Sequence, residues 1–331
     1  MKQSRPASAQ QQRPVAVQND RPAPVQQDRP LPGVGVLFNP ALIDFVEQHA
    51  QALDHLAVIP DRCWVDPGPG AEGRFRPLPA PLALLDRVAQ QRPVTLHSIG
   101  LSICSADVFD RPYVDNLARW SAHWRARWVS EHLSFSRVGS AHEVNAALAL
   151  PVAYDDEMLD LLVPRIDAVQ QRLGVPFLLE NNVAYVSIPE QGMGEAEFLN
   201  RLCARTSCSL LLDLHNLYTN AVNHRFSAHA FLDELELSRV TEMHVAGGQS
   251  MMGFHTDSHT GPVHEGVWPL LAAAAERASA LQAVTFEFHE SSWPMLHTEG
   301  VLAQLAQARA VLARVAAKRA FEEETSTSLA F

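Results

Sequence analysis

The order of apolar and polar residues shows a regular pattern from residue 33 to the C-terminus. Short apolar runs alternate there with longer stretches whose apolar residues recur three or four positions apart. A short apolar run is typical of a buried strand, and the longer spacing is typical of a helix that buries one face. The pattern predicts strands at Gly33–Phe38, His55–Ile59, Val94–Ser98, Trp128–Leu133, Phe177–Glu180, Leu210–Leu214, Glu242–Val245 and Ala283–Phe288.

Helical patterns follow each of these strands. They cover Pro40–Leu53, Pro79–Gln91, Arg111–Arg127, Asp155–Leu173, Glu195–Thr206, Ala228–Leu235, Val267–Ala280 and Glu299–Phe321. Strand-then-helix units repeated eight times within about 290 residues favour an α/β fold, the (β/α)8 barrel. A doubly wound open sheet is the alternative, but the chain lacks the glycine-rich phosphate turn of its nucleotide-binding versions.

The first thirty residues differ in kind from the rest. Arg-Pro recurs there at positions 5, 13, 21 and 29, among Gln, Ala and Val and without an aromatic residue. Such a composition buries too little apolar surface to order a chain. We expect a disordered Pro/Gln-rich arm at 1–30, a single barrel domain at 31–321 and a flexible C-terminal tail at 322–331.

Composition narrows the class of protein. The formal net charge of −11 argues against a nucleic-acid-binding surface. The four cysteines form no C-x-x-C pair, which is typical of reduced thiols in a cytoplasmic protein. The chain has neither an apolar signal-peptide core nor an apolar run long enough to span a membrane, so we expect no membrane partner.

Donor side chains follow six consecutive predicted strands. In a (β/α)8 barrel the C-terminal strand ends meet at one mouth, where active sites lie. Any one of these residues has an ordinary structural explanation, but burying so many ionisable groups together without a counter-ion is costly. One or more bound metal ions would offset that cost. The donors are His97, His132, Glu180, Asp213 with His215, His244, and Glu287, and the loop after His244 adds Asp257 and His259.

The donor types indicate which metals suit the site. Imidazole and carboxylate ligands without thiolate favour Fe, Mn or Zn over a structural cysteine–zinc site. The set is too large for one ion, so two or three ions with bridging carboxylates are expected. Hydrolysis by a metal-bound hydroxide and oxygen activation at iron both fit such ligands.

Several segments, in one order, resemble a known family. They are GVGV at 33–36, LHSIGLSI at 96–103, VSEHLSFS at 129–136, LLENNVAY at 178–185, LLLDLHNLYTNAVNH at 210–224, EMHVAGG at 242–248, DSHTGPVHEGVW at 257–268 and FEFHES at 286–291. The chain resembles the multinuclear non-haem iron-dependent oxidative enzymes, a family that includes the methanobactin-biosynthesis and 3-thiaglutamate-pathway oxidases. The resemblance runs from about residue 33 to residue 297 and implies a xylose-isomerase-like barrel of the triosephosphate isomerase type.

The resemblance also implies an activity and partners. Such enzymes use two or three irons, cycling between Fe(II) and Fe(III), and O2 as co-substrate to modify a residue of a ribosomally made precursor peptide, either Cys or another residue of its C-terminal region. A separate protein usually recruits the leader peptide. The ligands implied are His97, His132, Glu180, Asp213, His215, His244, Asp257, His259 and Glu287. His215 stands where the family more often has Asn.

Three further residues are candidates for supporting the ligands or transferring protons: His224, His264 and Glu290. Other readings stay open from the donor set alone. A metal-dependent sugar isomerase or phosphodiesterase on a similar barrel uses the same types of ligand, and so does a non-catalytic metal-binding protein.

Overall fold

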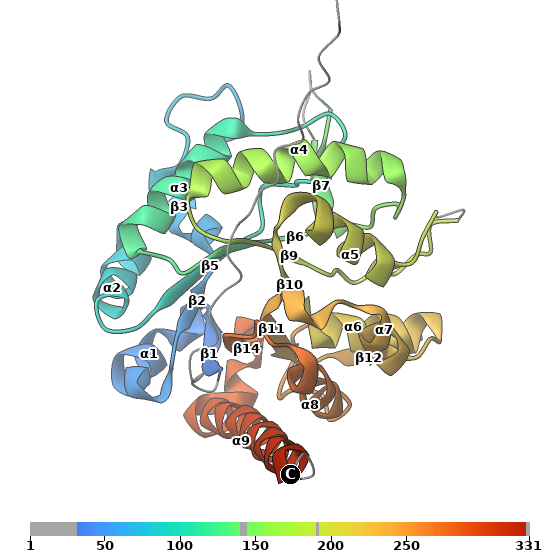
Figure 1. The fold of residues 1–331 in the computed structure, drawn as a ribbon. Helices are drawn as coiled ribbons and strands as arrows, with labels where there is room; N and C mark the ends of the chain where they lie inside the picture. The colour runs from blue at the N-terminus through green and yellow to red at the C-terminus, as the bar shows by residue number, and fades with distance from the viewer. Residues whose placement is uncertain (1–31, 140–143, 190–191, 329–331) are drawn as a thin grey trace, which may run out of the picture. The chain divides into compact units, whose positions relative to one another are not determined.

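The computed structural model describes residues 32–139, 144–189 and 192–328. All eight expected strands form within these ranges, and they pair in parallel as one closed barrel in the order β1-β14-β11-β10-β9-β6-β5-β2 (Figure 1). Pairing of β1 with both β14 and β2 closes the ring. The predicted (β/α)8 barrel is therefore confirmed. The strands are β1 Gly33–Phe38, β2 Leu56–Val58, β5 Val94–Ser98, β6 Val129–His132, β9 Phe177–Glu180, β10 Ser209–Asp213, β11 Val240–Ala246 and β14 Ala283–Glu287.

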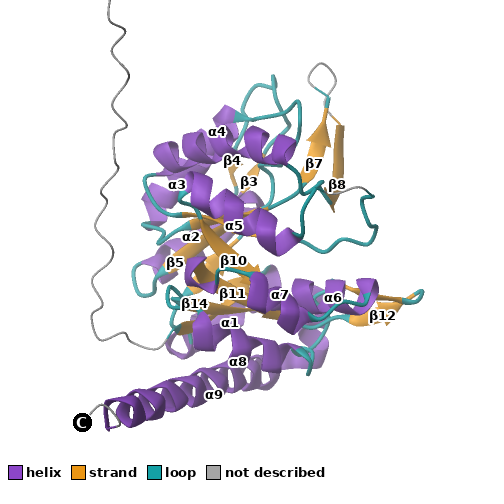
Figure 2. Cartoon of the chain, turned by 45° about the vertical axis from the view of Figure 1, so that its right-hand side comes forward, coloured by secondary structure: helices purple, strands orange, loops and turns teal. Residues whose placement is uncertain are grey.

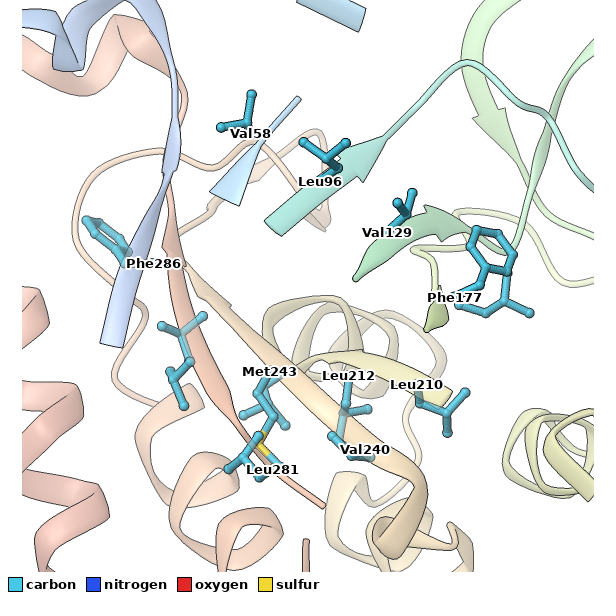
Figure 3. Close-up of a cluster of buried hydrophobic side chains, with 14 of the residues drawn as sticks. Val58, Leu96, Val129, Phe177, Leu210, Leu212, Val240, Met243, Leu281 and Phe286 are labelled. Atoms are coloured by element: carbon cyan, nitrogen blue, oxygen red, sulfur yellow. The ribbon is translucent and has the colours of Figure 1, made fainter. Parts of the chain in front are cut away.

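Helices surround the barrel, as the cartoon in Figure 2 shows. The main apolar core lies between the strands and these helices; Figure 3 shows part of it, including Val129, Phe177 and Phe286. The helices are α1 Ile43–His49, α2 Pro79–Ala89, α3 Arg111–Trp124, α4 Asp156–Leu173, α5 Glu195–Thr206, α6 Leu214–His224, α7 Ala228–Glu234, α8 Val267–Arg277 and α9 Trp293–Ser328. No helix among the described residues has the length and apolar character needed to cross a bilayer.

Side chains inside the barrel change from apolar to polar along the strands. Trp128, Leu178, Leu211 and Ala283 form a small apolar cluster separate from the main core. Successive side chains of a strand point to opposite faces, so positions two residues further on face the same interior. Those positions, 130, 180, 213 and 285, carry Ser, Glu, Asp and Thr, and all four are buried. The interior is therefore polar toward the C-terminal strand ends.

Gly35 of β1 leaves room inside the barrel for the ring of His55. A Cβ atom at position 35 would lie 2.3 Å from the carbonyl oxygen of His55 and 2.7 Å from its ring atoms. Contacts that short do not occur between real atoms, so any side chain at position 35 would displace strand β2 or the ring.

Two sequence expectations are corrected. The segment between the predicted strand at Leu210–Leu214 and the predicted helix at Ala228–Leu235 forms a further helix, α6, which begins directly at Leu214 and buries Leu214, Leu217 and Ala221 at helical spacing. The final helix extends to Ser328 instead of ending at residue 321, because helix formation continues through a run of glutamates. The predicted arm at 1–30 lies outside the described residues.

Three short antiparallel strand pairs also form among the described residues, in the segments that follow barrel strands. They are β3 Trp64–Val65 with β4 Arg76–Pro77, β7 Phe135–Val138 with β8 Val144–Leu150, and β12 Gln249–Met251 with β13 Phe254–Thr256. They follow β2, β6 and β11 at the C-terminal ends of these strands. Strands β7 and β12 can be located in Figure 2.

Candidate metal centre

Seven of the nine predicted ligands form three adjacent groups at the C-terminal strand ends. In each group one possible ligand atom per residue lies within 4.8 Å of the others. Glu180 belongs to the first two groups and Asp213 to the last two, so the groups form a connected chain. The groups are His97, His132 and Glu180; Glu180, Asp213 and His244; and Asp213, His259 and Glu287.

Strand register brings these donors together. His132, Glu180, Asp213 and Glu287 are each the last residue of their strand. His132 is the direct neighbour of Glu180 across the β6–β9 pairing, and Asp213 is the direct neighbour of His244 across the β10–β11 pairing. The side chains of directly paired residues on one face are close, so parallel strands that end together present a continuous row of donors.

Glu180 is the shared carboxylate of the first two groups. Its Oε2 lies 3.4 Å from His97 Nε2 and 3.5 Å from His132 Nε2. This oxygen is buried and has no hydrogen-bond partner among the described residues. Burial raises the pKa of Glu180 to about 8, because the charged form loses its hydration.

The pKa values of the two histidines in the first group shift in opposite directions. Burial, together with the nearby rings of His132 and His244, holds the pKa of His97 well below its usual range. Burial acts against the charged form of His132 as well, but the carboxylates of Glu180 and Glu131 outweigh it and raise the pKa of His132 to about 9.

Asp213 has one oxygen fixed and the other unused. Its Oδ1 accepts a hydrogen bond of 2.7 Å from the backbone N–H of Asn216 and so caps the N-terminus of α6. Its Oδ2 is buried without a partner in the described part of the chain, 3.9 Å from His244 Nδ1. Asn181 holds the backbone of Asp213 through its side-chain amide, with bonds of 2.8 and 3.0 Å. Burial raises the pKa of Asp213.

Glu287 belongs to the third group and also contacts His244 of the second. Its Oε2 lies 3.2 Å from His244 Nδ1, and its Oε1 lies 3.4 Å from His259 Nδ1. Burial disfavours the charged carboxylate, but His259 and His244 outweigh it and hold the pKa of Glu287 well below its usual range. Asp257 and Glu287 in turn overcome the effect of burial on His259 and raise its pKa to about 10.

The remaining two predicted ligands, His215 and Asp257, lie beside the third group. Asp257 Oδ1 is 2.9 Å from His259 Nε2 and 3.2 Å from His215 Nδ1. The other ring nitrogen of His215 packs against Gly248, where a Cβ would lie 2.5 Å from it. The two residues are therefore linked to His259, although neither belongs to the three groups.

The three residues predicted to assist the ligands have other contacts. His224, at the end of α6, bonds through Nε2 to the carbonyl oxygen of Ala184. His264 stacks on Tyr218 with ring centroids 4.5 Å apart, and its Nδ1 accepts from the N–H of Gly266. Glu290 forms an exposed ion pair of 3.1 Å with Arg62. None of them belongs to the three groups.

Sequence reasoning missed two buried residues beside the ligand rings, Ser130 and Glu242. His97 Nδ1 lies 2.9 Å from Ser130 Oγ, and His244 Nε2 lies 3.4 Å from Glu242 Oε1. Ser130 and Glu242 each precede a donor histidine by two positions on the same strand. Period-two alternation was the available signal, since it places both residues in the interior layer below the ligands.

The fold and these donors define a (β/α)8-barrel protein whose mouth brings together three groups of residues that could hold a metal ion. The family model described as "RiPP precursor modification enzyme MbnB/TglH/ChrH" matches residues 33–313, and the chain belongs to this family. RiPP denotes a ribosomally synthesised and post-translationally modified peptide, so the family acts on precursor peptides.

Related sequences carry names without a described activity. A "UPF0276 protein" of Rhizorhabdus wittichii is 38% identical over 243 residues, which covers 73% of this chain and 82% of the relative. A "UPF0276 protein" of Caulobacter vibrioides is 35% identical over 230 residues, covering 70% and 80% respectively.

Solved structures share the fold. D-psicose 3-epimerase of Clostridium cellulolyticum H10, with D-tagatose, has a TM-score of 0.52 at 11% identity, covering 86% of this chain and 98% of the epimerase. The IolI protein, solved with a zinc atom, has a TM-score of 0.52 at 13% identity, covering 86% and 98% respectively. At these identities the likeness shows the barrel architecture alone.

Proposed function

We propose that the protein is a multinuclear iron- and O2-dependent oxidase that modifies a residue of a ribosomally synthesised precursor peptide. The observation that carries the proposal is the chain of three donor groups joined through Glu180 and Asp213. Glu180 and Asp213 each belong to two of these groups, and two shared carboxylates in series fit two or three ions better than one.

The donor atoms fit a bound metal. One oxygen of Glu180 and one of Asp213 are buried without hydrogen-bond partners in the described ranges, and an unpaired buried carboxylate oxygen is costly unless a cation neutralises it. The groups combine imidazole with carboxylate and contain no cysteine, which favours iron over soft-ligand metals. The proposed ligands are His97, His132, Glu180, Asp213, His244, His259 and Glu287, with His215 and Asp257 beside the third group.

Iron with open coordination positions would supply O2 activation when bound. The chain itself orients the ligands. Ser130 holds the ring of His97, while Asn216 and Asn181 fix Asp213 so that only its Oδ2 is offered. A ligand fixed by its surroundings keeps its geometry without reorganising when the cation arrives.

The second group is more deeply buried than the first and third groups. The side chains of Asp213 and His244 are fully buried, whereas those of His132 and His259 are each 24% exposed. Solvent and substrate thus reach the first and third groups while protein encloses the middle one. We infer that the reacting residue of the peptide approaches the first or the third group. Water reaches these two groups until the bound peptide fills the mouth of the barrel.

The hairpins around the mouth suit a peptide-sized substrate. Val144 and Leu148 on β8 are 60% and 58% exposed, and Met252 between β12 and β13 is 92% exposed. Exposed apolar side chains in such number are typical of surfaces that bind another chain. A leader-peptide-recruiting partner protein is part of the same proposal.

The proposed proton-transfer residues differ in their access to the site. His264 is the best placed of the three. Its ring centroid lies 5.2 Å from that of His255, and the ring centroid of His255 lies 5.5 Å from that of His215 beside the third group. Proton transfer requires hydrogen-bond reach in the substrate complex. His224 and Glu290 are proposed only to shape the surrounding backbone and rim.

The test is reconstitution followed by peptide mass analysis. Metal-free protein is loaded anaerobically with Fe(II), analysed for metal content, and mixed with O2 and a candidate precursor peptide. Iron-dependent oxygen consumption with a changed peptide mass is the expected result. Stoichiometric zinc in the active protein, without any dependence on iron or O2, would overturn the proposal and favour a hydrolytic or isomerase reaction.

A further inference from the structure

A cavity of about 660 Å³ lies beside the first donor group. It is formed by the segments that follow β2, β5 and β6, together with α3, and its lining includes Asp61, Trp64, Pro67, Gly100, Tyr113 and Arg137. Strands β2, β5 and β6 are neighbours in the barrel, and β5 and β6 carry His97 and His132 of the first group. The cavity has the size of a typical ligand site and lies at the same end of the barrel as the proposed metal centre.

Only a short distance separates this cavity from the first group. His97 and Gly100 are three residues apart along the chain, so their Cα atoms lie within about 11 Å of each other. The N–H of Leu101 donates to Glu131 Oε2 at 3.0 Å, and Glu131 Oε1 accepts from the N–H of His132 at 2.9 Å. An extended peptide covers such a distance with about three residues. A peptide that reacts at the first group can therefore place a nearby side chain in the cavity.

Asp61 is the carboxylate of the cavity that lacks a cation. Arg74 pairs with both Asp66 and Asp110 at 2.6 Å, and Arg137 pairs with Asp110 at 3.0 Å. Asp61 forms no ion pair with any of the described residues. Three carboxylates thus face two guanidinium groups, and the unbalanced negative charge belongs to Asp61. A negative charge in a cavity attracts a cationic ligand.

The carboxylate of Asp61 is fixed in place by hydrogen bonds. Its Oδ1 accepts from the hydroxyl of Tyr113 at 2.5 Å, and its Oδ2 accepts from the N–H of Ile99 at 3.2 Å. Gly100 packs against it so closely that a Cβ at position 100 would lie 2.6 Å from Oδ1. Burial raises the pKa of Asp61 to about 7. A carboxylate has about four acceptor positions, so each oxygen can still accept from a ligand.

We propose that the cavity binds a basic side chain, Lys or Arg, of the precursor peptide, within about three residues of the one that reacts at the first group. Asp61 accepts hydrogen bonds from the charged end of this side chain, while Trp64, Pro67 and Pro69 cover its methylene groups. The inference deepens the proposed function and rests on it, because it requires a peptide at the first group. Substrates should therefore carry Lys or Arg close to the modified residue.

Asp61→Asn is the central variant, because it removes the charge and keeps the internal contacts. Its amide oxygen can accept from Ile99, and its NH2 can donate to the oxygen of Tyr113. Asp61→Lys reverses the charge. Asp86→Asn is the matched control, since Asp86 lines another cavity, of about 410 Å³, and accepts a hydrogen bond from Trp124. Circular dichroism and thermal unfolding establish that each variant is folded.

The first measurement uses N-acetyl-argininamide as the probe and the neutral N-acetyl-citrullinamide as its control. Each is titrated into metal-free full-length protein at pH 8, above the pKa of Asp61, and followed by NMR of the 15N-indole groups. The signal of Trp64, assigned with Trp64→Phe, reports on the cavity. We expect wild type and Asp86→Asn to bind the arginine probe about 10–100 times more tightly than Asp61→Asn does, and to discriminate against citrulline by a similar factor. Equal affinity of wild type and Asp61→Asn, or no saturable shift in wild type, overturns the proposal.

The second measurement asks whether the cation comes from a peptide. A random heptapeptide library is selected on the immobilised full-length protein and on each variant. Wild type and Asp86→Asn should enrich Lys and Arg, Asp61→Asn should lose this preference, and Asp61→Lys should enrich Asp and Glu. Binding of the arginine probe without enrichment of basic peptides would mean that the cavity takes a small free cation, which overturns the assignment to a peptide.

Both measurements are independent of iron and O2, so they separate this inference from the proposed function. If the preference for basic peptides depends on Asp61 but the iron-loaded protein oxidises no peptide, the oxidase proposal fails and the binding site stands. If an iron-dependent peptide oxidation is found and Asp61→Asn changes neither its KM nor the binding of basic peptides, the binding site fails and the oxidase proposal stands.

Discussion

Replacement of Glu180 by Gln should change metal binding and stability in opposite directions. Glu180 belongs to two of the three donor groups, whereas His132 belongs to one. An amide carries no charge and is a weaker ligand than a carboxylate for a hard divalent cation. Glu180→Gln should therefore lower the metal content by more than His132→Asn does, because it weakens two ion positions instead of one.

The stability of the metal-free protein should rise instead. Burial raises the pKa of Glu180 from 4.5 to about 8, so between these values the folded protein holds a proton that the unfolded chain has released. The stability that this bound proton contributes is fully present below pH 4.5. It falls by about 1.4 kcal/mol for each pH unit as the pH rises toward 8. At pH 7 the loss is about 3 kcal/mol, and Gln avoids it.

The assay is urea unfolding of chelator-treated protein at pH 5 and pH 7, together with metal analysis of the untreated protein. Glu195→Gln is the matched control, because burial also raises the pKa of Glu195, to about 7, but this residue belongs to none of the donor groups. It should gain stability at pH 7 and keep its full metal content. The reasoning is refuted if metal-free Glu180→Gln is less stable than wild type at pH 7, or if it retains every ion.

Three further predictions follow from other contacts. Gly35→Ala should lower the free energy of unfolding by about 1–3 kcal/mol or more, because the added Cβ would overlap His55. Urea unfolding measures this change, and an unchanged midpoint would contradict the packing argument. His259→Asn should remove the ion of the third group while His215→Asn retains it, as counted by elemental analysis; equal losses would mean that His215 is a ligand of equal weight. Glu290→Gln should change the free energy of unfolding by less than about 1 kcal/mol and leave the metal content intact, because the ion pair of Glu290 with Arg62 is exposed. A larger effect in either assay would assign Glu290 a role in the site.

Most of the barrel could be predicted from the sequence because the strand signal is local. Phe177–Glu180 and Val94–Ser98 have the predicted bounds, since each is a compact apolar run that ends in a polar residue. The missed helix α6 had a signal too, as Leu214, Leu217 and Ala221 follow helical spacing. Its asparagines and histidines are poor helix formers, and tertiary packing together with the Asp213 cap outweighs their propensity.

The closeness of most candidate donors could be predicted, but the way in which they group could not. Parallel strands that end together imply that His132 and Glu180 meet, because each ends its strand. Which carboxylates are shared depends on side-chain rotamers and strand stagger, and these follow from the packing of the whole barrel. Likewise, only the structure shows that Asp213 uses one oxygen to cap α6 and has the other unpaired.

The alternation that gives β11 its donors also restricts how this protein can change in evolution. Glu242 and His244 occupy one face of the strand, and Met243 packs in the main core on the other. Deleting a single residue before Glu242 would shift the register by one, turning His244 toward the helices and Met243 toward the proposed metal centre. Insertions and deletions should therefore accumulate in the hairpins and helix connections of related chains, while the barrel strands keep constant lengths.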